Sequence, residues 1–272
     1  MAKSALLKSS ITKKYWMALT GLFLCLFLVG HLAGNLQLIF GTPLQFNEYA
    51  LFMTSNPAVK ILSYLTYFSI LFHAIDGIAL TILNKKARPI AYVKNNPSAN
   101  SSSASRNMAV LGTLILIFIV THMVNFWAKM HFDKNMPLQE TVVESPMGGE
   151  DIVLYNTTNG SYVEKAGVEV KNGKEFYNTQ LDLKMGEGYK DLYKITIDFF
   201  KDSKYGLIAT ICYTLAMFVL AFHLWHGFQS AFQSLGINNS RWTPIIKLSG
   251  KIFSVIVPLL FAIIPLYIHF IK

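Results

Sequence analysis

The chain has 272 residues and a formal net charge of +9; 53% of its residues are hydrophobic and only 14% are charged. Soluble domains carry roughly 25% charged residues, so this composition excludes a disordered chain and argues against an ordinary soluble enzyme. The two cysteines, Cys25 and Cys212, both lie inside apolar runs. Their position excludes a disulfide scaffold, a zinc–cysteine site and covalent haem attachment through a C-x-x-C-H motif.

Five apolar segments occur along the chain, and each can cross a hydrocarbon layer of ~30 Å, which needs about 20 helical residues. They lie near Tyr15–Phe40, Ala58–Leu83, Met108–Met130, Gly206–Ser230 and Lys251–Ile271. None alternates as a barrel strand does, and helices satisfy their own backbone hydrogen bonds in lipid. The sequence therefore predicts an all-α membrane protein with five transmembrane helices. Its regions are the first three helices (1–130), an external segment (131–204) and the last two helices (205–272).

Lysine and arginine gather in three segments that contain no aspartate or glutamate: residues 1–14, 84–107 and 231–251. Cytoplasmic loops of membrane proteins carry an excess of these residues. We therefore expect the three segments in the cytoplasm, with the N-terminus inside and the C-terminus outside. Basic loops on this side are topology signals and contacts for lipid headgroups. The expected partner is membrane lipid, and no nucleic acid is expected.

The external segment 131–204 differs in composition, because it carries thirteen of the fifteen acidic residues together with nine lysines. Two Asn-Gly pairs between short alternating runs predict small hairpins; they are Asn159-Gly160 and Asn172-Gly173. A helical stripe then predicts a helix on the membrane surface; its residues are Leu192, Ile195, Phe199 and Phe200. The segment has no catalytic motif, so we interpret it as a solvated cap.

Histidines are the informative polar residues of the spans. Five of the seven lie well inside apolar segments: His31, His73, His122, His223 and His226. Ionisable residues at such depth are costly and mark a function or a cofactor. A lone histidine would fit an interhelical hydrogen bond equally well. Here, however, four successive helices each carry one near mid-membrane.

The depth of each histidine follows from its distance to the cytoplasmic end of its span. At ~1.5 Å per residue, His31 and His122 lie ~24 and ~21 Å deep, and His73 and His223 lie ~15 and ~10 Å deep. These two layers predict two bis-histidine haems stacked across the membrane. A neutral imidazole suits an axial ligand because one ring nitrogen binds iron while the other donates to a polar partner. Two separated layers do not make one tetrahedral zinc centre.

Small residues occur beside three of these histidines, where a large planar ring needs room. They are Gly30 and Gly34 beside His31, Gly77 after His73 and Gly227 after His223. The spacing Gly30-x-x-x-Gly34 is equally typical of plain helix–helix packing, and the two uses are compatible.

Around these histidines the sequence resembles the cytochrome b membrane-anchor subunit of type B succinate dehydrogenases and fumarate reductases. The stretches that carry the resemblance are VGHLAGNLQ around His31, FNEYALFMTSNP after the first span, FHAIDG around His73, VTHMVNFW around His122 and FHLWHGFQSAFQSLG around His223. The resemblance covers all five spans and does not extend to the external segment. It implies a five-helix fold with two b-type haems in a bundle formed by the first four helices.

In that family the second and fourth helices hold the haem near the iron–sulfur subunit, and the first and third hold the distal haem. The resemblance therefore implies His73 and His223 as iron ligands of the proximal haem b. It implies His31 and His122 as iron ligands of the distal haem b.

The fourth helix offers a second histidine, His226. The family pattern places a glycine four residues after the ligand, and Gly227 satisfies this for His223 only. His131 and His269 match no ligand of the family, and we interpret them as interfacial residues.

The resemblance implies a subunit that transfers electrons between cytoplasmic flavoprotein and iron–sulfur subunits and a menaquinone-type quinone. The complex would belong to the respiratory chain and the tricarboxylic acid cycle, in the bacterial cytoplasmic membrane. The chain itself has no flavin motif and no cluster cysteines, so no catalytic residue and no activity of the subunit alone are expected. Succinate oxidation and fumarate reduction both stay open, as does the quinone species.

Two other interpretations stay open: another di-haem cytochrome b anchor of a respiratory dehydrogenase, or a non-haem transporter in which histidines relay protons. Two acidic residues also need an explanation. Glu48, in the first external loop, either passes protons to a quinone or is a solvated loop acid or an interfacial partner of Lys60. Asp76, the only acid inside a span, either hydrogen-bonds to His226 or reaches a cation such as Arg106.

Overall fold

The structure is a computed structural model that describes residues 9–90, 96–144 and 149–272. The chain forms two compact units. We call Met1–Asn35, Ile61–Val120 and Ile208–Lys272 the helical unit, and Leu36–Lys60 and Thr121–Leu207 the sheet unit. The protein is mostly helical, as the sequence predicts. The sheet unit adds two small antiparallel sheets to the predicted all-α class.

Five helical stretches in the described parts of the chain are long and apolar enough to cross a membrane, which confirms the five predicted spans. They are Ser10–Phe40, Pro57–Lys86, Met108–Phe132, Gly206–Ser234 and Trp242–Phe270. Many of their large apolar side chains are exposed, among them Leu26 and Ile61 at 69% each. Apolar surface of this extent suits lipid rather than water. The chain thus has the features of a multi-pass membrane protein.

The helices of these spans are α2 (Ser10–Asn35), α5 (Pro57–Lys86), α8 (Met108–His122), α11 (Gly206–Ser234) and α12 (Trp242–Phe270). Within the helical unit α2 packs against α12. At Gly250 of α12 an added Cβ would lie 2.8 Å from Cδ1 of Phe228 on α11. A glycine at this position therefore lets the α12 backbone lie against the Phe228 ring.

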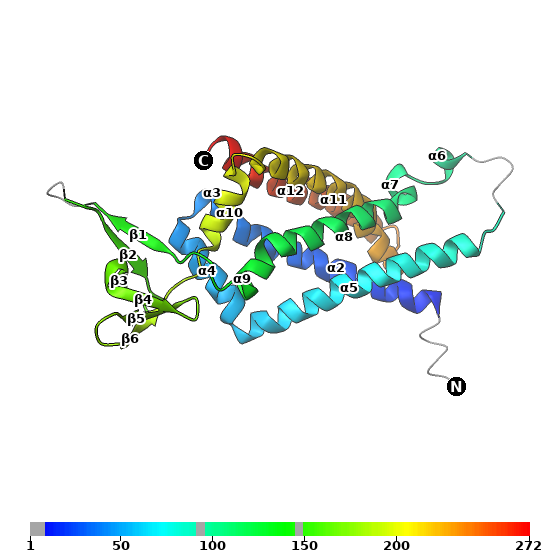
Figure 1. Ribbon diagram of the computed structural model, residues 1–272. Helices are drawn as coiled ribbons and strands as arrows, with labels where there is room; N and C mark the ends of the chain where they lie inside the picture. The colour runs from blue at the N-terminus through cyan, green and yellow to red at the C-terminus, as the bar shows by residue number, and fades with distance from the viewer. Residues whose placement is uncertain (1–8, 91–95, 145–148) are drawn as a thin grey trace, which may run out of the picture. The chain divides into compact units, whose positions relative to one another are not determined.

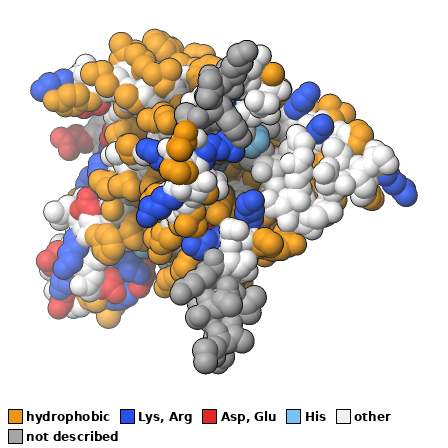
Figure 2. All heavy atoms as spheres, turned by 90° about the vertical axis from the view of Figure 1, so that its right-hand side faces the viewer, with side chains coloured by type: hydrophobic (Ala, Val, Ile, Leu, Met, Phe, Trp, Pro, Cys, Tyr) orange, Lys and Arg blue, Asp and Glu red, His pale blue; other side chains and the backbone are white. Residues whose placement is uncertain are grey.

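The connection between α5 and α8 contains two short helices, α6 (Pro97–Asn100) and α7 (Ser103–Arg106) (Figure 1). Figure 2 shows the side of the molecule on which α6 and α7 lie, where Lys and Arg side chains gather among hydrophobic ones. The described basic residues of the helical unit in the three segments that the sequence places in the cytoplasm are Lys13, Lys14, Lys85, Lys86, Arg88, Arg106, Arg241, Lys247 and Lys251.

The last span begins at Trp242, well before the apolar run that starts near Lys251. Its first turn is capped by Asn239, whose Oδ1 accepts hydrogen bonds from the backbone N–H groups of Arg241 (3.1 Å) and Trp242 (2.9 Å). A side chain that satisfies the first N–H groups lets a helix begin in a polar segment. For this reason hydropathy alone underestimates the length of α12.

Beyond His122 the third span changes its hydrogen-bond pattern. α8 continues as a π-helix, η1 (Met123–Ala128), and then as α9 (Lys129–Phe132). π-Helical turns are rare and occur frequently at functional sites. His122, a predicted iron ligand, directly precedes this turn.

The sheet unit contains α3 (Gln37–Phe40) and α4 (Pro43–Ser55), and α4 is a helix where the sequence predicts only a loop. A capping box begins it: Gln45 N donates to Thr42 Oγ1 (3.2 Å), and Thr42 N donates to Gln45 Oε1 (3.0 Å). This reciprocal pair and the proline at the first position are typical of a helix N-terminus. The signal was therefore present in the sequence.

In the parts of the chain that the structure describes, six strands make two three-stranded antiparallel sheets. They are β1 (Glu140–Val143), β2 (Ile152–Asn156) and β3 (Tyr162–Glu164) in one sheet, and β4 (Val168–Lys171), β5 (Glu175–Asn178) and β6 (Lys184–Glu187) in the other. Both predicted hairpins are confirmed. Asn172 and Gly173, between β4 and β5, have φ angles of 54° and 72°. Few residues adopt positive φ as readily as Asn and Gly, which explains this pair at the turn.

The two sheets share a small apolar core. Tyr155 of β2 stacks on Phe176 of β5 with ring centroids 4.7 Å apart, and Leu138 completes the buried cluster. An added Cβ at Gly188 would overlap the Phe176 ring, so only glycine fits there. This core holds together a module that otherwise consists of polar turns and short strands.

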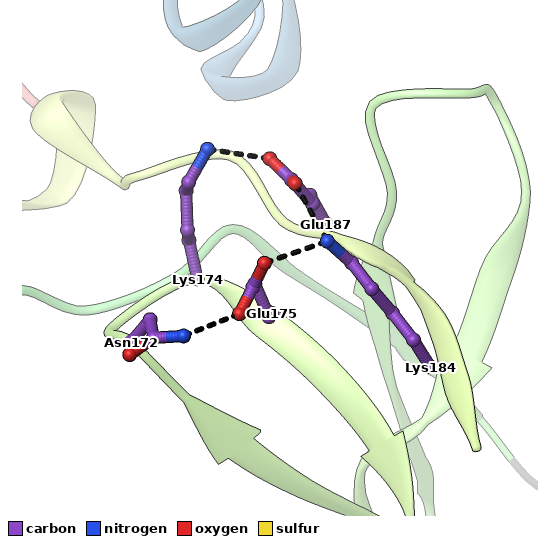
Figure 3. Close-up of polar contacts among 5 residues, drawn as sticks. All are labelled: Asn172, Lys174, Glu175, Lys184 and Glu187. Carbon is purple, nitrogen blue, oxygen red and sulfur yellow. Dashed lines mark hydrogen bonds and ion pairs between the residues drawn. The ribbon is translucent and has the colours of Figure 1, made fainter.

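Ion pairs surround the second sheet (Figure 3). Lys184 Nζ lies 2.6 Å from Glu175 Oε1 and 2.8 Å from Glu187 Oε1. Hydrogen bonds from Lys184 and then Asn172 lower the pKa of Glu175 below its ordinary value. Hydrogen bonds from Lys174 and then Lys184 lower the pKa of Glu187. These carboxylates therefore stabilise the folded sheet only while they are ionised.

A buried polar cluster joins α4 to the segments that precede β1 and α10 (Leu192–Lys201). Asn47 is 1% exposed; its Nδ2 donates to Gln139 Oε1 (2.6 Å) and Asp191 Oδ1 (2.8 Å). Its Oδ1 accepts from the backbone N–H of Tyr193 (3.0 Å). Buried amides require such partners. One side chain thus ties three separate parts of the sheet unit.

α10 confirms the helix predicted from the apolar stripe. Its buried residues are Tyr193, Thr196 and Phe200, and it packs on α4. Part of the predicted apolar face is therefore covered by protein. Its placement on a membrane surface stays a prediction.

Candidate functional site

Two of the predicted ligands meet in the helical unit. His73 lies on α5 and His223 on α11, and their imidazole centroids are 6.2 Å apart with the ring planes at 68°. Metal–imidazole bonds are about 2 Å long, so two histidines that bind a metal ion from opposite sides have ring centroids about 6 Å apart. The spacing suits one iron atom between the two rings.

The α2 helix supplies the hydrogen-bond partners of His73. Nδ1 of His73 lies 3.2 Å from the carbonyl oxygen of Met17 and 3.3 Å from Oγ1 of Thr20. A carbonyl oxygen only accepts, so Nδ1 carries the hydrogen and Nε2 keeps the lone pair that binds a metal. Metal-binding histidines commonly donate their other N–H to a backbone carbonyl in this way.

His223 has a different environment. Its Nδ1 is buried and has no hydrogen-bond partner among the described residues. Buried ring nitrogens without a partner are rare in folded proteins and point to a strained or functional position. The two facing histidines are therefore unequal, since one is fixed by α2 and the other is held only by packing.

Two glycines border the pair. An added Cβ at Gly21 of α2 would lie 3.1 Å from Cε1 of His73, tighter than ordinary contact, and one at Gly112 of α8 would lie 3.7 Å from Cε1 of His223. Gly21 therefore permits the close approach of α2 to the His73 ring. Sequence reasoning missed both glycines, although both lie in the same half of their spans as the inner histidine layer.

The glycines chosen from the sequence lie elsewhere. An added Cβ at Gly30 or Gly77 would meet nothing within 4 Å, and one at Gly227 would lie 3.7 Å from Cε of Met108. Gly34 is buried in α2. Gly30 and Gly77 thus leave open space beside their helices, and an added Cβ at Gly227 would meet a methionine rather than a histidine ring.

His31 lies on α2 at a different level from the pair. Thr20 of the same helix contacts His73, and His31 lies about 16 Å further along the helix axis. The His31 ring stacks on Phe27 (centroids 5.2 Å apart) and lies 5.7 Å from Phe261 of α12. Asn35 Nδ2 lies 3.4 Å from its Nδ1. This separation along α2 agrees with two ligand layers.

His122 lies in the sheet unit, which includes Thr121–Leu207. Its ring centroid lies 5.3 Å from that of Phe126 in η1, and Phe126 packs against Phe199 and Phe200 of α10. The predicted pair of His31 and His122 would join the two units, so it stays a prediction.

The remaining candidates of the helical unit have other surroundings. The ring that faces His73 is that of His223 and not that of His226. Among the described residues, Asp76 forms no hydrogen bond or ion pair with His226 or with Arg106. Arg106 instead donates from its guanidinium to the carbonyl oxygen of Pro97 (2.9 Å). Asp76 therefore makes neither of these two direct contacts within the described residues.

Glu48 lies exposed on α4. In the described structure it makes no ion pair with Lys60. It is close enough to Tyr189 that burial first, and the charge of Glu48 second, raise the pKa of that phenol. Glu48 is thus available to solvent or to a bound molecule, and the pair with Lys60 is not formed.

Within the described residues no three His, Cys, Asp or Glu side chains come together to hold a metal ion. The candidate metal ligands that lie together in the described helical unit are the two imidazoles of His73 and His223. Two neutral imidazoles are a common axial ligand set of a b-type haem, whose porphyrin supplies the other four ligands. The residues therefore fit the group that the sequence predicts.

No family model, no curated protein and no solved structure matches this chain. The functional interpretation consequently depends on the residues of the chain and on their geometry.

Proposed function

We propose that the chain is the di-haem cytochrome b membrane anchor of a succinate dehydrogenase or fumarate reductase. In this proposal His73 and His223 are the ligands of one b-type haem, and His31 and His122 are the ligands of the other. The anchor transfers electrons between flavoprotein and iron–sulfur subunits, bound in the cytoplasm, and menaquinone in the bacterial cytoplasmic membrane.

The proposal depends above all on one observation: the imidazole rings of His73 and His223, on two different apolar helices, lie close to each other. Ionisable side chains are rare in such helices and are retained there for a function. Their centroid distance of 6.2 Å suits a common metal ion. The hydrogen bond from Nδ1 of His73 to Met17 leaves Nε2 as the metal-binding atom. A proton relay does not require two imidazoles at this separation with one ring fixed in this tautomer.

A haem bound at these histidines supplies one-electron transfer, and its potential depends on its axial ligands and their hydrogen bonds. The chain itself holds the two imidazoles neutral and oriented. It surrounds them with apolar helices that keep water away, and the helical unit contains a single carboxylate, Asp76. Asp76 is therefore the one acidic side chain of this unit whose negative charge opposes the charge that an electron brings.

Two ligand layers along α2 give electrons a path across the membrane. The level of His31 lies about 16 Å beyond that of Thr20 and His73. Electrons from succinate that cross to a quinone at the outer layer each gain up to ~2.3 kcal/mol per 100 mV of membrane potential. This gain drives the otherwise unfavourable reduction of menaquinone by succinate.

Sealed vesicles that contain the assembled complex test the proposal. We expect the flavoprotein and iron–sulfur subunits to co-purify with the chain. Succinate–menaquinone activity should fall when a protonophore collapses the membrane potential. A succinate–menaquinone rate that does not depend on the membrane potential contradicts electron transfer across the membrane. A chain that assembles with no flavoprotein contradicts the assignment to this class of complex.

A further inference from the structure

We infer that Thr20, on the first transmembrane helix, is a positioning residue that fixes His73 and lowers the potential of the haem bound between His73 and His223. The inference rests on the proposed function and extends it to a residue that contributes no ligand. It follows from two contacts of α2 with His73 of α5 and from the close approach of α2 to this ring at Gly21.

The first contact sets the tautomer of the ring. Nδ1 of His73 lies 3.2 Å from the Met17 carbonyl oxygen, so this nitrogen is the donor. The second contact is with Oγ1 of Thr20, 3.3 Å from the same Nδ1. One N–H group thus faces two acceptors, which is a bifurcated hydrogen bond of the kind found at helices.

The hydroxyl of Thr20 is itself oriented. Its oxygen lies 2.8 Å from the carbonyl oxygen of Trp16, one turn earlier in α2, and therefore donates its hydrogen there. With its hydrogen so committed, the Thr20 oxygen presents a lone pair to His73. Thr20 is 4% exposed, so water does not replace it as an acceptor.

Gly21 permits α2 to lie close to the ring. Gly21 follows Thr20, and an added Cβ there would lie 3.1 Å from Cε1 of His73. The α2 backbone therefore approaches the imidazole as closely as a glycine allows. Met17, Thr20 and Gly21 form one surface of α2 that receives the edge of the His73 ring.

The consequence follows from the chemistry of axial ligands. An acceptor on the N–H of a metal-bound imidazole raises the basicity of the ligand, and a more basic ligand favours ferric over ferrous iron. His223 has no such acceptor among the described residues, because its buried Nδ1 is without a partner. The potential of this haem is therefore set mainly on the His73 side, and Thr20 supplies half of the acceptors there.

The test is a redox titration of both haems in the purified assembled complex, with the Thr20→Val variant beside the wild type. Valine keeps the β-branched shape and removes the acceptor. We expect the ferric-to-ferrous ratio of one haem, at fixed ambient potential, to fall by threefold to tenfold. A tenfold change corresponds to about 59 mV upward for a one-electron couple. The other haem should titrate as in the wild type.

Two further variants separate the hydroxyl from packing. Thr20→Ser restores the acceptor, so it should return the titration to within twofold of the wild type. Thr66→Val is the matched control, because Thr66 of α5 is also 4% exposed and donates to Leu62 within its own helix (2.9 Å) without touching His73. It should leave both haems unchanged.

The outcomes are distinct. If Thr20→Val loses one haem while Thr20→Ser and Thr66→Val keep both, the positioning role stands. If Thr20→Val titrates as the wild type does, or if Thr20→Ser shifts as Thr20→Val does, the inference is wrong although the haem assignment stands. If the wild-type complex binds no haem, both the proposed function and this inference fail.

Discussion

The two units of the chain differ in the number, sign and pairing of their charged residues. The helical unit contains thirteen Lys and Arg residues and one acid, Asp76, whereas the sheet unit contains eleven lysines and fourteen acids. Their net charges are therefore +12 and −3. Basic residues of the helical unit lie mostly at the ends and loops of helices, and acids and lysines of the sheet unit pair with each other, as around Lys184.

This difference in charge decides whether the important polar residues of a unit can be recognised from the sequence or only from the structure. In apolar helices every ionisable side chain is costly, so the few that occur, above all His31, His73 and His223, stand out in the sequence. In the sheet unit polar residues are abundant, and the ones that matter are identified only by their contacts. Asn47 is such a residue, since its amide is buried and fully hydrogen-bonded.

The largest expected effect is on haem content. Replacement of His73 or His223 by alanine should remove one of two haems, since a b-type haem with one axial ligand left is poorly held. The haem-to-protein ratio of the purified complex should fall by half. His226→Ala is the matched control on α11 and should retain both haems. Loss of a haem in His226→Ala, with two haems retained in His223→Ala, contradicts the assignment of His223 as the haem ligand on α11.

The next effect concerns the sheet unit. Asn47→Ala leaves Gln139 Oε1 and the Tyr193 N–H without their partner, whereas Asp191 Oδ1 keeps the hydrogen bond from the Lys194 N–H. Each buried unsatisfied group costs about 1–3 kcal/mol. We expect local opening of α10 to become about 3 kcal/mol easier and amide hydrogen exchange in α10 to rise about a hundredfold.

Gln45→Ala is the control for this prediction, because Gln45 is an exposed amide on the same helix. It removes half of the capping box and should cost about 1 kcal/mol or less. Equal exchange of α10 in the two variants contradicts the central role of Asn47. The haem assigned to His73 and His223 should be retained in both variants, since these two ligands lie in the helical unit.

The smallest effect is on acid stability. The pKa values of Glu175 and Glu187 lie below their ordinary value of 4.5 in the folded protein. Their stabilisation is therefore present above pH 4.5 and is lost as the pH falls through the folded pKa. Because both carboxylates are near the surface, the loss is small. Cleavage by pepsin, normalised to an unstructured peptide, should increase within residues 165–190 between pH 5 and pH 3.

Glu175→Gln should weaken this pH dependence, because the variant has lost the titrating group. Glu164→Gln is the control, since Glu164 is exposed and has no ion pair among the described residues. A pH dependence that is identical in both variants and in the wild type shows that other carboxylates govern the acid stability of the sheet.

Local signals explain what the sequence predicts correctly. The five spans follow from apolar length, and the hairpin at Asn172-Gly173 follows from two residues that adopt positive φ. The proximity of His73 and His223 follows from their similar depth along the helices, and their role as ligands stays a prediction. Each of these features depends on neighbours in the chain or on a fixed rise per residue.

Contacts between distant segments explain what the sequence does not predict. Asn47 meets Gln139 and Asp191 across 92 and 144 residues, and no local pattern indicates that pairing. The contact of Thr20 with His73 depends on the rotation of α2 about its axis, which hydropathy does not determine. The π-helix after His122 is likewise a departure from the regular pattern that apolar composition does not reveal.

The central claim is that histidines of the apolar helices hold haem, and an optical spectrum of the purified complex tests it most directly. A spectrum reduced with dithionite minus the oxidised spectrum should show the α, β and Soret bands of a b-type cytochrome. Extraction should give two non-covalently bound haems per chain. A complex that retains all its subunits and shows no reducible haem bands contradicts the account.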